Sequence, residues 1–130
     1  MTIVVGYAPT AEGRAALDRA VEEALQRGRR LVVVNSSRGD SLVDSGFATE
    51  AEIEEIRGRL ESAGVHFEIR RPVRGQEASD EVVQAAKEVD ASLIVIGLRR
   101  RTAVGKLILG SNAQRILLDA ECPVLAVKAG

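Results

Sequence analysis

The sequence predicts an α/β protein, built from a five-stranded parallel sheet with helices on both faces. Five short segments rich in Val and Ile are bounded by Gly, Pro, Ser or charged residues, as strands usually are. The segments between them carry apolar residues at helical spacing, so strand and helix alternate along the chain. Such alternation requires crossover connections, which are right-handed in nearly all known proteins and produce a parallel sheet covered on both faces.

The expected strands comprise residues 2–7, 30–35, 65–70, 92–97 and 123–128. The first, second and fourth fit strands that are buried on both faces of the sheet. The third alternates instead, with three apolar residues on one side and three polar ones on the other: Val65, Phe67 and Ile69 against His66, Glu68 and Arg70. We therefore expect this strand at an edge of the sheet, with His66 facing solvent.

Local signals also indicate where the intervening helices begin and end. Thr49 precedes Glu52, and Ser111 precedes Gln114, at the spacing of a capping box. Gly28 and Gly64 stand where the first two helices should end, while Gly58 lies inside the second. The residues at helical spacing are Ala16, Leu17, Ala20, Val21, Ala24 and Leu25; Ile53, Ile56 and Leu60; Val82, Ala86 and Val89; and Ala113, Ile116, Leu117 and Ala120.

Composition favours one domain, residues 1–130, and excludes some classes of partner. Of the 130 residues, 45% are hydrophobic, which suits a single compact core. Eighteen basic residues stand against 19 acidic ones, so the net charge of -1 would not attract nucleic acid or anionic lipid. The aromatic share of 2% is too small for base-stacking platforms. We expect neither nucleic acid nor a membrane as a partner.

The cysteine content and the apolar runs indicate the compartment. Cys122 is the single cysteine, which excludes an internal disulfide and a multi-cysteine metal site, and we expect it to be a small buried side chain. The opening segment "MTIVVGY" is too short for a signal peptide, and no later apolar run approaches a membrane-spanning length. The expected location is therefore the cytoplasm.

The loops after residues 2–7 and 92–97 are the most informative about a ligand. Open parallel sheets bind ligands beyond the carboxyl ends of their strands, at the point where the strand order reverses. The second loop starts at Gly97, contains Arg99, Arg100 and Arg101, and reaches Gly110 and Ser111 at the start of the last helix. A helix N-terminus offers free N–H groups and a partial positive charge, so this loop can receive an anion.

These features resemble the universal stress protein family. Its nucleotide-binding members carry Gly, two residues, Gly, nine residues, Gly and then Ser or Thr after the fourth strand. The resemblance extends over the whole chain and includes "AAL" at residues 15–17, "SLIVIG" and the closing "CPVLAVK". It implies a Rossmann-like sheet ordered 3-2-1-4-5, a non-enzymatic role in stress response, and ATP or another adenine nucleotide as the ligand.

Two positions depart from the motif of this family. Gly97, Gly110 and Ser111 match its first glycine, its last glycine and the hydroxyl residue that follows. Arg100 stands at the second glycine, where the backbone must reach a positive φ or approach a phosphate closely. After the first strand, Ala8 takes the place of an aspartate that meets the adenosine of the ligand, and Pro9 and Thr10 follow it. The resemblance thus implies a site with weakened selection for adenosine.

Each of these residues also has an explanation that requires no ligand. The guanidinium of Arg100 can pair with phosphate, but a run of three arginines is more often a solvated turn. Ser111 is explained as a helix cap by its spacing to Gln114. Gly97 is explained as a strand end, and Gly110 as a residue that permits the turn into the helix.

The sequence contains no evident catalytic constellation. The one histidine, His66, is expected on an edge strand, and no serine or cysteine has an identifiable base. Asp40 and Asp44 lack the pattern of a calcium loop, so no metal site is expected. The acids expected on solvated helix faces are Glu22, Glu23, Glu52, Glu54, Glu55, Glu81 and Glu88.

Three functional hypotheses remain open from the sequence. The first is a sensor that binds an adenine nucleotide or another phosphate-bearing ligand through residues 97–111. The second is a dimeric interaction module that has lost its ligand. The third is a slow ATPase, against which Ala8, Arg100 and the absence of an evident general base argue. For assembly, residues 122–128 form an apolar strand at a sheet edge, which favours a homodimer with Val124 and Leu125 near its interface or core.

Overall fold

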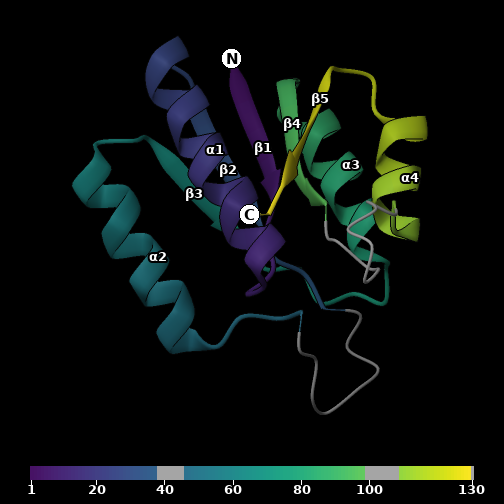
Figure 1. The fold of residues 1–130 in the computed structure, drawn as a ribbon, viewed down its shortest axis with the longest axis horizontal. Coiled ribbons are helices and arrows are strands. Elements are labelled where there is room, and N and C mark those ends of the chain that lie inside the picture. The colour runs from purple at the N-terminus through teal and green to yellow at the C-terminus, as the bar shows by residue number, and fades with distance from the viewer. Residues whose placement is uncertain (38–45, 99–108, 130) are drawn as a thin grey trace.

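A computed structural model describes residues 1–37, 46–98 and 109–129. Five parallel strands form one sheet in the order β3-β2-β1-β4-β5, which confirms the predicted fold class and strand order (Figure 1). The strands are β1 (Thr2–Gly6), β2 (Arg30–Val34), β3 (Phe67–Arg70), β4 (Ala91–Leu98) and β5 (Val124–Lys128). The helices are α1 (Ala11–Arg27), α2 (Glu50–Ala63), α3 (Ala78–Glu88) and α4 (Ser111–Asp119).

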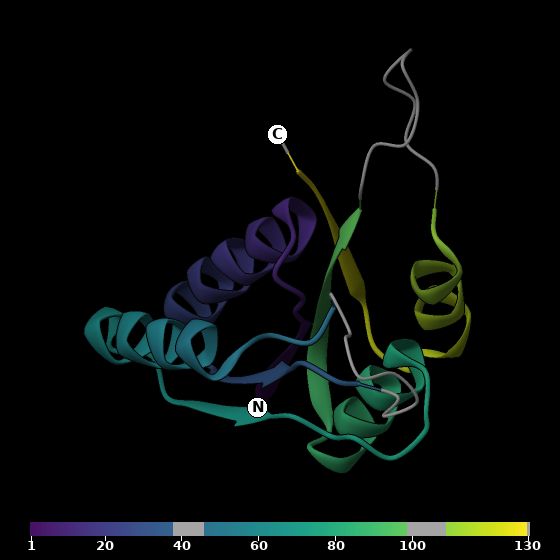
Figure 2. The ribbon, with the colours of Figure 1, turned by 90° about the horizontal axis from the view of Figure 1, so that it is seen from below.

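The sheet separates two hydrophobic clusters. Helices α1 and α2 cover one face, and α3 and α4 cover the other (Figure 2). Successive residues of a strand point to opposite faces, so Ile3 and Val5 of β1 enter the cluster under α1 and α2, whereas Val4 enters the cluster under α3 and α4. Because the central strands are covered on both sides, their sequences are continuous apolar runs.

Three of the four predicted helix-boundary signals are confirmed. Thr49 and Glu52 form the capping box of α2, with both reciprocal hydrogen bonds present. Gly28 and Gly64 follow α1 and α2 with φ of 62° and 78°, in the left-handed region that glycine adopts most readily. The second capping box is wrong: α4 begins after Gly110, and Ser111 is its first helical residue.

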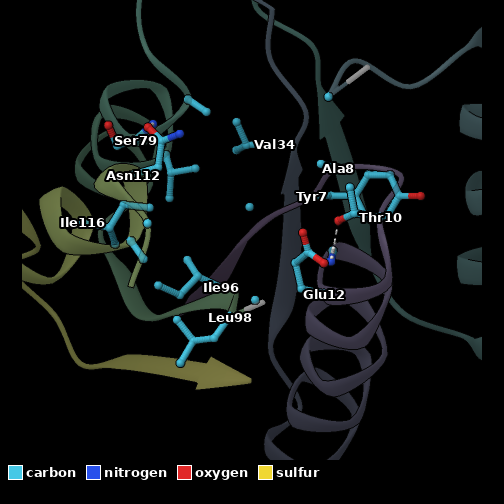
Figure 3. Close-up of a pocket in the computed structure, with 18 of the residues that line it drawn as sticks. Tyr7, Ala8, Thr10, Glu12, Val34, Ser79, Ile96, Leu98, Asn112 and Ile116 are labelled. Atoms are coloured by element: carbon cyan, nitrogen blue, oxygen red, sulfur yellow. Dashed lines mark hydrogen bonds between the residues drawn. The ribbon is translucent and has the colours of Figure 1, made fainter. Parts of the chain in front are cut away.

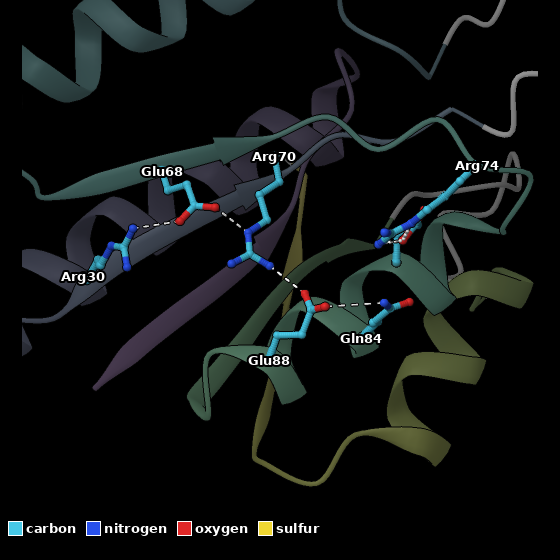
Figure 4. A network of polar contacts seen from close by, with 7 residues as sticks. Arg30, Glu68, Arg70, Arg74, Gln84 and Glu88 are labelled. Carbon is cyan, nitrogen blue, oxygen red and sulfur yellow. Dashed lines mark hydrogen bonds and ion pairs between the residues drawn. The ribbon is translucent and has the colours of Figure 1, made fainter.

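The predicted edge position of residues 65–70 is confirmed, although β3 itself begins at Phe67. Among the described strands β3 pairs only with β2, and His66 is exposed. Its polar side forms a chain of ion pairs: Glu68 accepts from Arg30 and Arg70, and Arg70 also donates to Glu88 of α3 (Figure 4). These arginine contacts, with Arg70 first, lower the pKa of Glu68.

Several side chains differ from their expected exposure. Glu81 was expected on a solvated face but its side chain is fully buried, because Arg74 binds its carboxylate through bonds of 2.7–3.0 Å. Glu23 is also buried, between Arg19 and Arg27. Conversely, Leu25 and Leu117, which were expected on the apolar faces of their helices, are exposed. Local spacing alone therefore misplaced both kinds of residue.

Two further features concern the predicted partners and compartment. Cys122 is half-buried against the cluster under α3 and α4, and burial raises the pKa of its thiol. In the part of the chain that the structure describes, every helix is too short or too polar to cross a membrane.

Candidate functional site

A cavity of about 660 Å³ opens at the carboxyl ends of β1 and β4. These neighbouring strands mark the point where the strand order reverses, so the cavity lies where open parallel sheets place their ligands. Figure 3 shows two walls: Tyr7, Ala8, Thr10 and Glu12 on one side, and Ser79, Asn112 and Ile116 on the other. The apolar side chains between them include Val34, Ile96 and Leu98.

The first wall is a tight turn between β1 and α1. The hydroxyl of Thr10 accepts a hydrogen bond of 3.0 Å from the Gly13 N–H and so caps α1. The Thr10 N–H donates to the Ala8 carbonyl at 2.8 Å. A Cβ on Gly13 would lie 1.9 Å from that carbonyl oxygen, so only glycine fits there. Thr10, which the sequence analysis proposed as a site residue, lines the cavity and is also the N-cap of α1.

Gly97 lies inside β4, in contact with this turn. A Cβ at this position would lie 2.2 Å from the carbonyl oxygen of Glu12, in the first turn of α1. Gly97, which the sequence analysis proposed as a ligand-binding residue, lines the cavity, but close approach of α1 to the strand already requires glycine. The first glycine of the motif is thus explained without a ligand, by packing rather than by the end of a strand.

Asn35 was not singled out from the sequence, yet it supports the same wall. Its side chain is fully buried at the end of β2 and donates to the carbonyls of Tyr7 and Gly46, both at 2.9 Å. Its oxygen accepts from the Ala48 N–H, also at 2.9 Å. Asn35 thereby joins the end of β1 to residues 46–48. A polar residue closing the apolar run "RLVVVN" was the available signal.

The N-termini of α3 and α4 form the second wall. Neither N-cap residue, Glu77 of α3 or Gly110 of α4, makes a side-chain capping bond. Instead, the side-chain oxygen of Asn112 accepts from the Ser79 N–H at 3.2 Å, so α4 partly caps α3. The first N–H groups of α4 have no partner within the helix, and they lie at its N-terminus, which lines the cavity and stabilises anions.

Ser111 lacks the capping role that the sequence suggested, whereas Gly110 does stand at the turn into α4, as its N-cap. Gly110 has φ of -70°, which any residue adopts, and a Cβ there would meet no atom within 4 Å among the described residues. Ser111 does not cap α4, and Gln114 donates instead to the Leu109 carbonyl at 3.1 Å. Both residues line the cavity. The packing of the described chain therefore requires neither of them.

Among the described residues, two acidic side chains line the cavity, Glu12 on the first wall and Glu77 on the second. Tyr7 adds a phenol whose pKa is raised, mainly because it is buried, so the hydroxyl keeps its proton at neutral pH. Glu12 was not predicted as a site residue, because it lies outside the motif positions that the sequence analysis matched.

Some predicted residues have no place in this geometry. Arg99, Arg100 and Arg101 lie outside the described residues, as do Asp40 and Asp44. His66 directly precedes β3, at the far edge of the sheet from β5. Within residues 1–37, 46–98 and 109–129, no group of three or more His, Cys, Asp or Glu side chains could hold a metal ion.

Comparisons with known proteins agree with this architecture. A universal stress protein from Mycolicibacterium smegmatis is 49% identical over 126 residues, covering 97% of this chain and 96% of that protein. The universal stress protein from Archaeoglobus fulgidus, solved in complex with dAMP, has a TM-score of 0.67 and 33% identity, with 98% of each chain covered.

A second solved structure, a universal stress protein in complex with cAMP, has a TM-score of 0.74 and 26% identity. It covers 100% of this chain, and 98% of its own chain is matched. The family model described as "Universal stress protein family" matches residues 1–128. This chain has a five-stranded parallel sheet and a cavity where the strand order reverses between β1 and β4. Together with these matches, that architecture shows that the chain belongs to the universal stress protein family.

Proposed function

We propose that this protein binds a nucleotide or another phosphate-bearing ligand in the cavity, as a non-enzymatic stress-response module formed by residues 1–130. Adenine nucleotides are the leading candidates, because solved relatives contain dAMP and cAMP. The phosphate contacts Gly110 and Ser111 at the start of α4, and the rest of the ligand extends toward Ala8 and Thr10. Glu77 makes the α3 side of that wall less favourable for an anion than the α4 side.

The observation that carries the proposal is the contrast between the two glycines of the motif. Gly97 is required by packing against Glu12, whereas no described atom and no unusual backbone angle requires Gly110. A glycine whose Cβ position is open, at a helix N-cap that lines a cavity, permits close approach of a phosphate. Ser111 beside it supplies a hydroxyl that the helix does not use.

The variant Gly110→Ala tests this assignment directly. The added methyl group meets nothing within 4 Å, but Gly110 is the N-cap of α4, where alanine is less favourable than glycine, so the free energy of unfolding should fall by about 0.5–1 kcal/mol and leave the protein folded. Its affinity for ATP, measured by isothermal titration calorimetry, should fall about tenfold as one phosphate contact is lost. Gly58→Ala, in α2 and away from the cavity, is the control and should bind like the wild type. Unchanged affinity in Gly110→Ala would contradict the assignment.

Binding should depend on salt more than on the base. Ala8 lines the cavity without the carboxylate that meets adenosine in the family, so ATP and GTP should bind with similar affinity. Contacts to phosphate, including pairing with the guanidinium of Arg100, weaken as ionic strength rises. The double variant Ala8→Asp, Arg100→Gly should favour ATP over GTP. Failure of the wild type to bind any of these anions at low salt would favour a ligand-free interaction module.

The proposal includes a homodimer formed through residues 122–128. Among the described residues, β5 pairs only with β4 and leaves its other edge unpaired, while Val124 and Leu125 contact opposite hydrophobic clusters. Ile94 donates to the Pro123 carbonyl, and alternation along the strand then turns the N–H groups of Val124 and Ala126 toward the open edge. An open apolar edge favours pairing across a two-fold axis.

Removal of one edge N–H tests the dimer. Ala126→Pro should give a monomer in sedimentation equilibrium at tens of micromolar, where an ordinary dimer persists, because proline cannot donate across the edge. Ala129→Pro, just beyond β5, is the matched control and should stay dimeric. A monomeric wild type would refute this part of the proposal while leaving ligand binding open.

A further inference from the structure

We infer that Glu12 selects the sugar of the bound ligand, by accepting hydrogen bonds from its hydroxyl groups. This inference rests on the proposed binding of a phosphate-bearing ligand and adds the residue that recognises the opposite end of that ligand. Neither the motif of the family nor the sequence pattern assigns a role to this position.

The backbone of Glu12 is held firmly at the mouth of the cavity. The Thr10 cap fixes the first turn of α1 through the Gly13 N–H. On the other side, Gly97 of β4 lies so close that its missing Cβ would be 2.2 Å from the Glu12 carbonyl oxygen and 3.0 Å from the Glu12 Cβ. The side chain is half-buried and extends from α1 toward the space between the two walls (Figure 3).

The carboxylate of Glu12 differs from those of four other acids that are at least half-buried. Glu23, Glu68 and Glu81 are each bound by an arginine, and Glu52 is bound by the Thr49 N–H. Within the described residues, the Glu12 carboxylate makes neither a hydrogen bond nor an ion pair. Since an ionised carboxylate in a partly enclosed site gains from hydrogen-bond donors, a ligand that donates would be stabilised there.

The position of this acid determines which part of a ligand it meets. The anion-binding end of the cavity is the N-terminus of α4, on the opposite wall, and a carboxylate repels phosphate. A nucleotide therefore binds with its phosphate at Gly110 and Ser111 and its neutral, hydroxyl-bearing sugar toward Glu12. The two carboxylate oxygens suit the two neighbouring hydroxyls of ribose. Glu12 thus replaces an acceptor that Ala8 does not offer, and it recognises sugar rather than base.

Titration of ATP, 2′,3′-dideoxy-ATP and inorganic triphosphate separates these contributions. The wild type should bind ATP about tenfold more tightly than the dideoxy nucleotide, the value of one charge-assisted contact. Glu12→Ala should bind ATP and dideoxy-ATP with equal affinity, and inorganic triphosphate at least as tightly as the wild type. Glu22→Ala, exposed on the same helix and outside the cavity, should keep the preference.

Each other outcome has a distinct meaning. Equal affinity of the wild type for the two nucleotides, or a preference that persists in Glu12→Ala, would overturn the inference and leave ligand binding intact. A wild type that binds none of the three anions would overturn the proposed function itself. If Glu12→Ala does not fold, as judged by circular dichroism, Glu12→Gln carries the test: its amide keeps one neutral acceptor oxygen, so the preference for ATP over dideoxy-ATP should shrink, and an unchanged preference would overturn the inference.

Discussion

Helices α1 and α4 both direct their N-termini at the cavity, but the protein holds them very differently. Seven of the 17 residues of α1 are buried, including Leu17, whereas only Ile116 is buried among the nine residues of α4. Leu117 and Leu118 of α4 are 43% and 83% exposed. The sugar-binding wall at the start of α1 is therefore anchored by a well-buried helix, whereas the phosphate-binding wall at the start of α4 is held by one buried side chain.

This difference assigns separate roles to the two walls. Segments with few buried apolar contacts open locally at lower free energy than the core does. α4 can thus adjust to an anion at small cost, while the turn that carries Ala8, Thr10 and Glu12 keeps its geometry. The following variants test the contrast, from the largest expected effect to the smallest.

Gly97→Ala should cause the largest loss, because it forces β4 and α1 apart. The added Cβ would lie 2.2 Å from the Glu12 carbonyl oxygen, and overpacking of this kind costs about 3 kcal/mol. Denaturant unfolding measures the loss. Gly58→Ala is the control: it meets nothing within 4 Å inside α2 and should raise stability by about 0.5–1 kcal/mol. Equal stability of the two variants would show that the first wall is not rigid.

Asn35→Ala should cost about 2–3 kcal/mol, because it leaves the buried groups of Tyr7 and Ala48 without partners. The amide of Ala48 should also exchange its hydrogen faster. The matching change on the second wall, Asn112→Ala, removes one bond to Ser79 and should cost only about 1 kcal/mol. A larger loss from Asn112→Ala than from Asn35→Ala would reverse the contrast between the walls.

Ile116→Ala should cost about 2 kcal/mol and act mainly on α4, whose one buried side chain it truncates. Hydrogen exchange should show faster opening of α4 amides, with α1 amides unchanged. Leu118→Ala removes an exposed side chain and should change stability by less than about 0.5 kcal/mol. Faster exchange throughout α1 in the first variant would show that the two walls unfold together.

Glu23→Gln should have the smallest effect, and that effect should depend on pH. Hydrogen bonds from Arg27 and Arg19 lower the pKa of Glu23 below its ordinary value of 4.5, so its ionised form stabilises α1. This contribution is present above pH 4.5 and is lost as pH falls through the lower folded-state pKa. The melting temperature of the variant should lie below that of the wild type at pH 7 and approach it near pH 3. Glu22→Gln, which is exposed, should match the wild type at both values.

The sequence by itself determined the elements whose signals are local. Thr49 and Glu52 are three residues apart, and a capping box needs nothing beyond that spacing. Gly28 and Gly64 end helices through their own backbone freedom. The alternation of residues 65–70 revealed an edge strand, because a strand covered on one face must present polar side chains on the other.

Tertiary structure decided the residues whose roles depend on distant parts of the chain. Gly97 is required by the first turn of α1, Glu81 is buried because Arg74 reaches it, and Asn35 joins three segments of backbone. At the start of α4, glycine and serine are both acceptable N-caps, differing by only a few tenths of a kcal/mol. In the structure α4 begins after Gly110, and Asn112 in its first turn accepts a hydrogen bond from the Ser79 N–H of α3. Energies this small are outweighed by a single packing contact, so no pattern along the chain can resolve them.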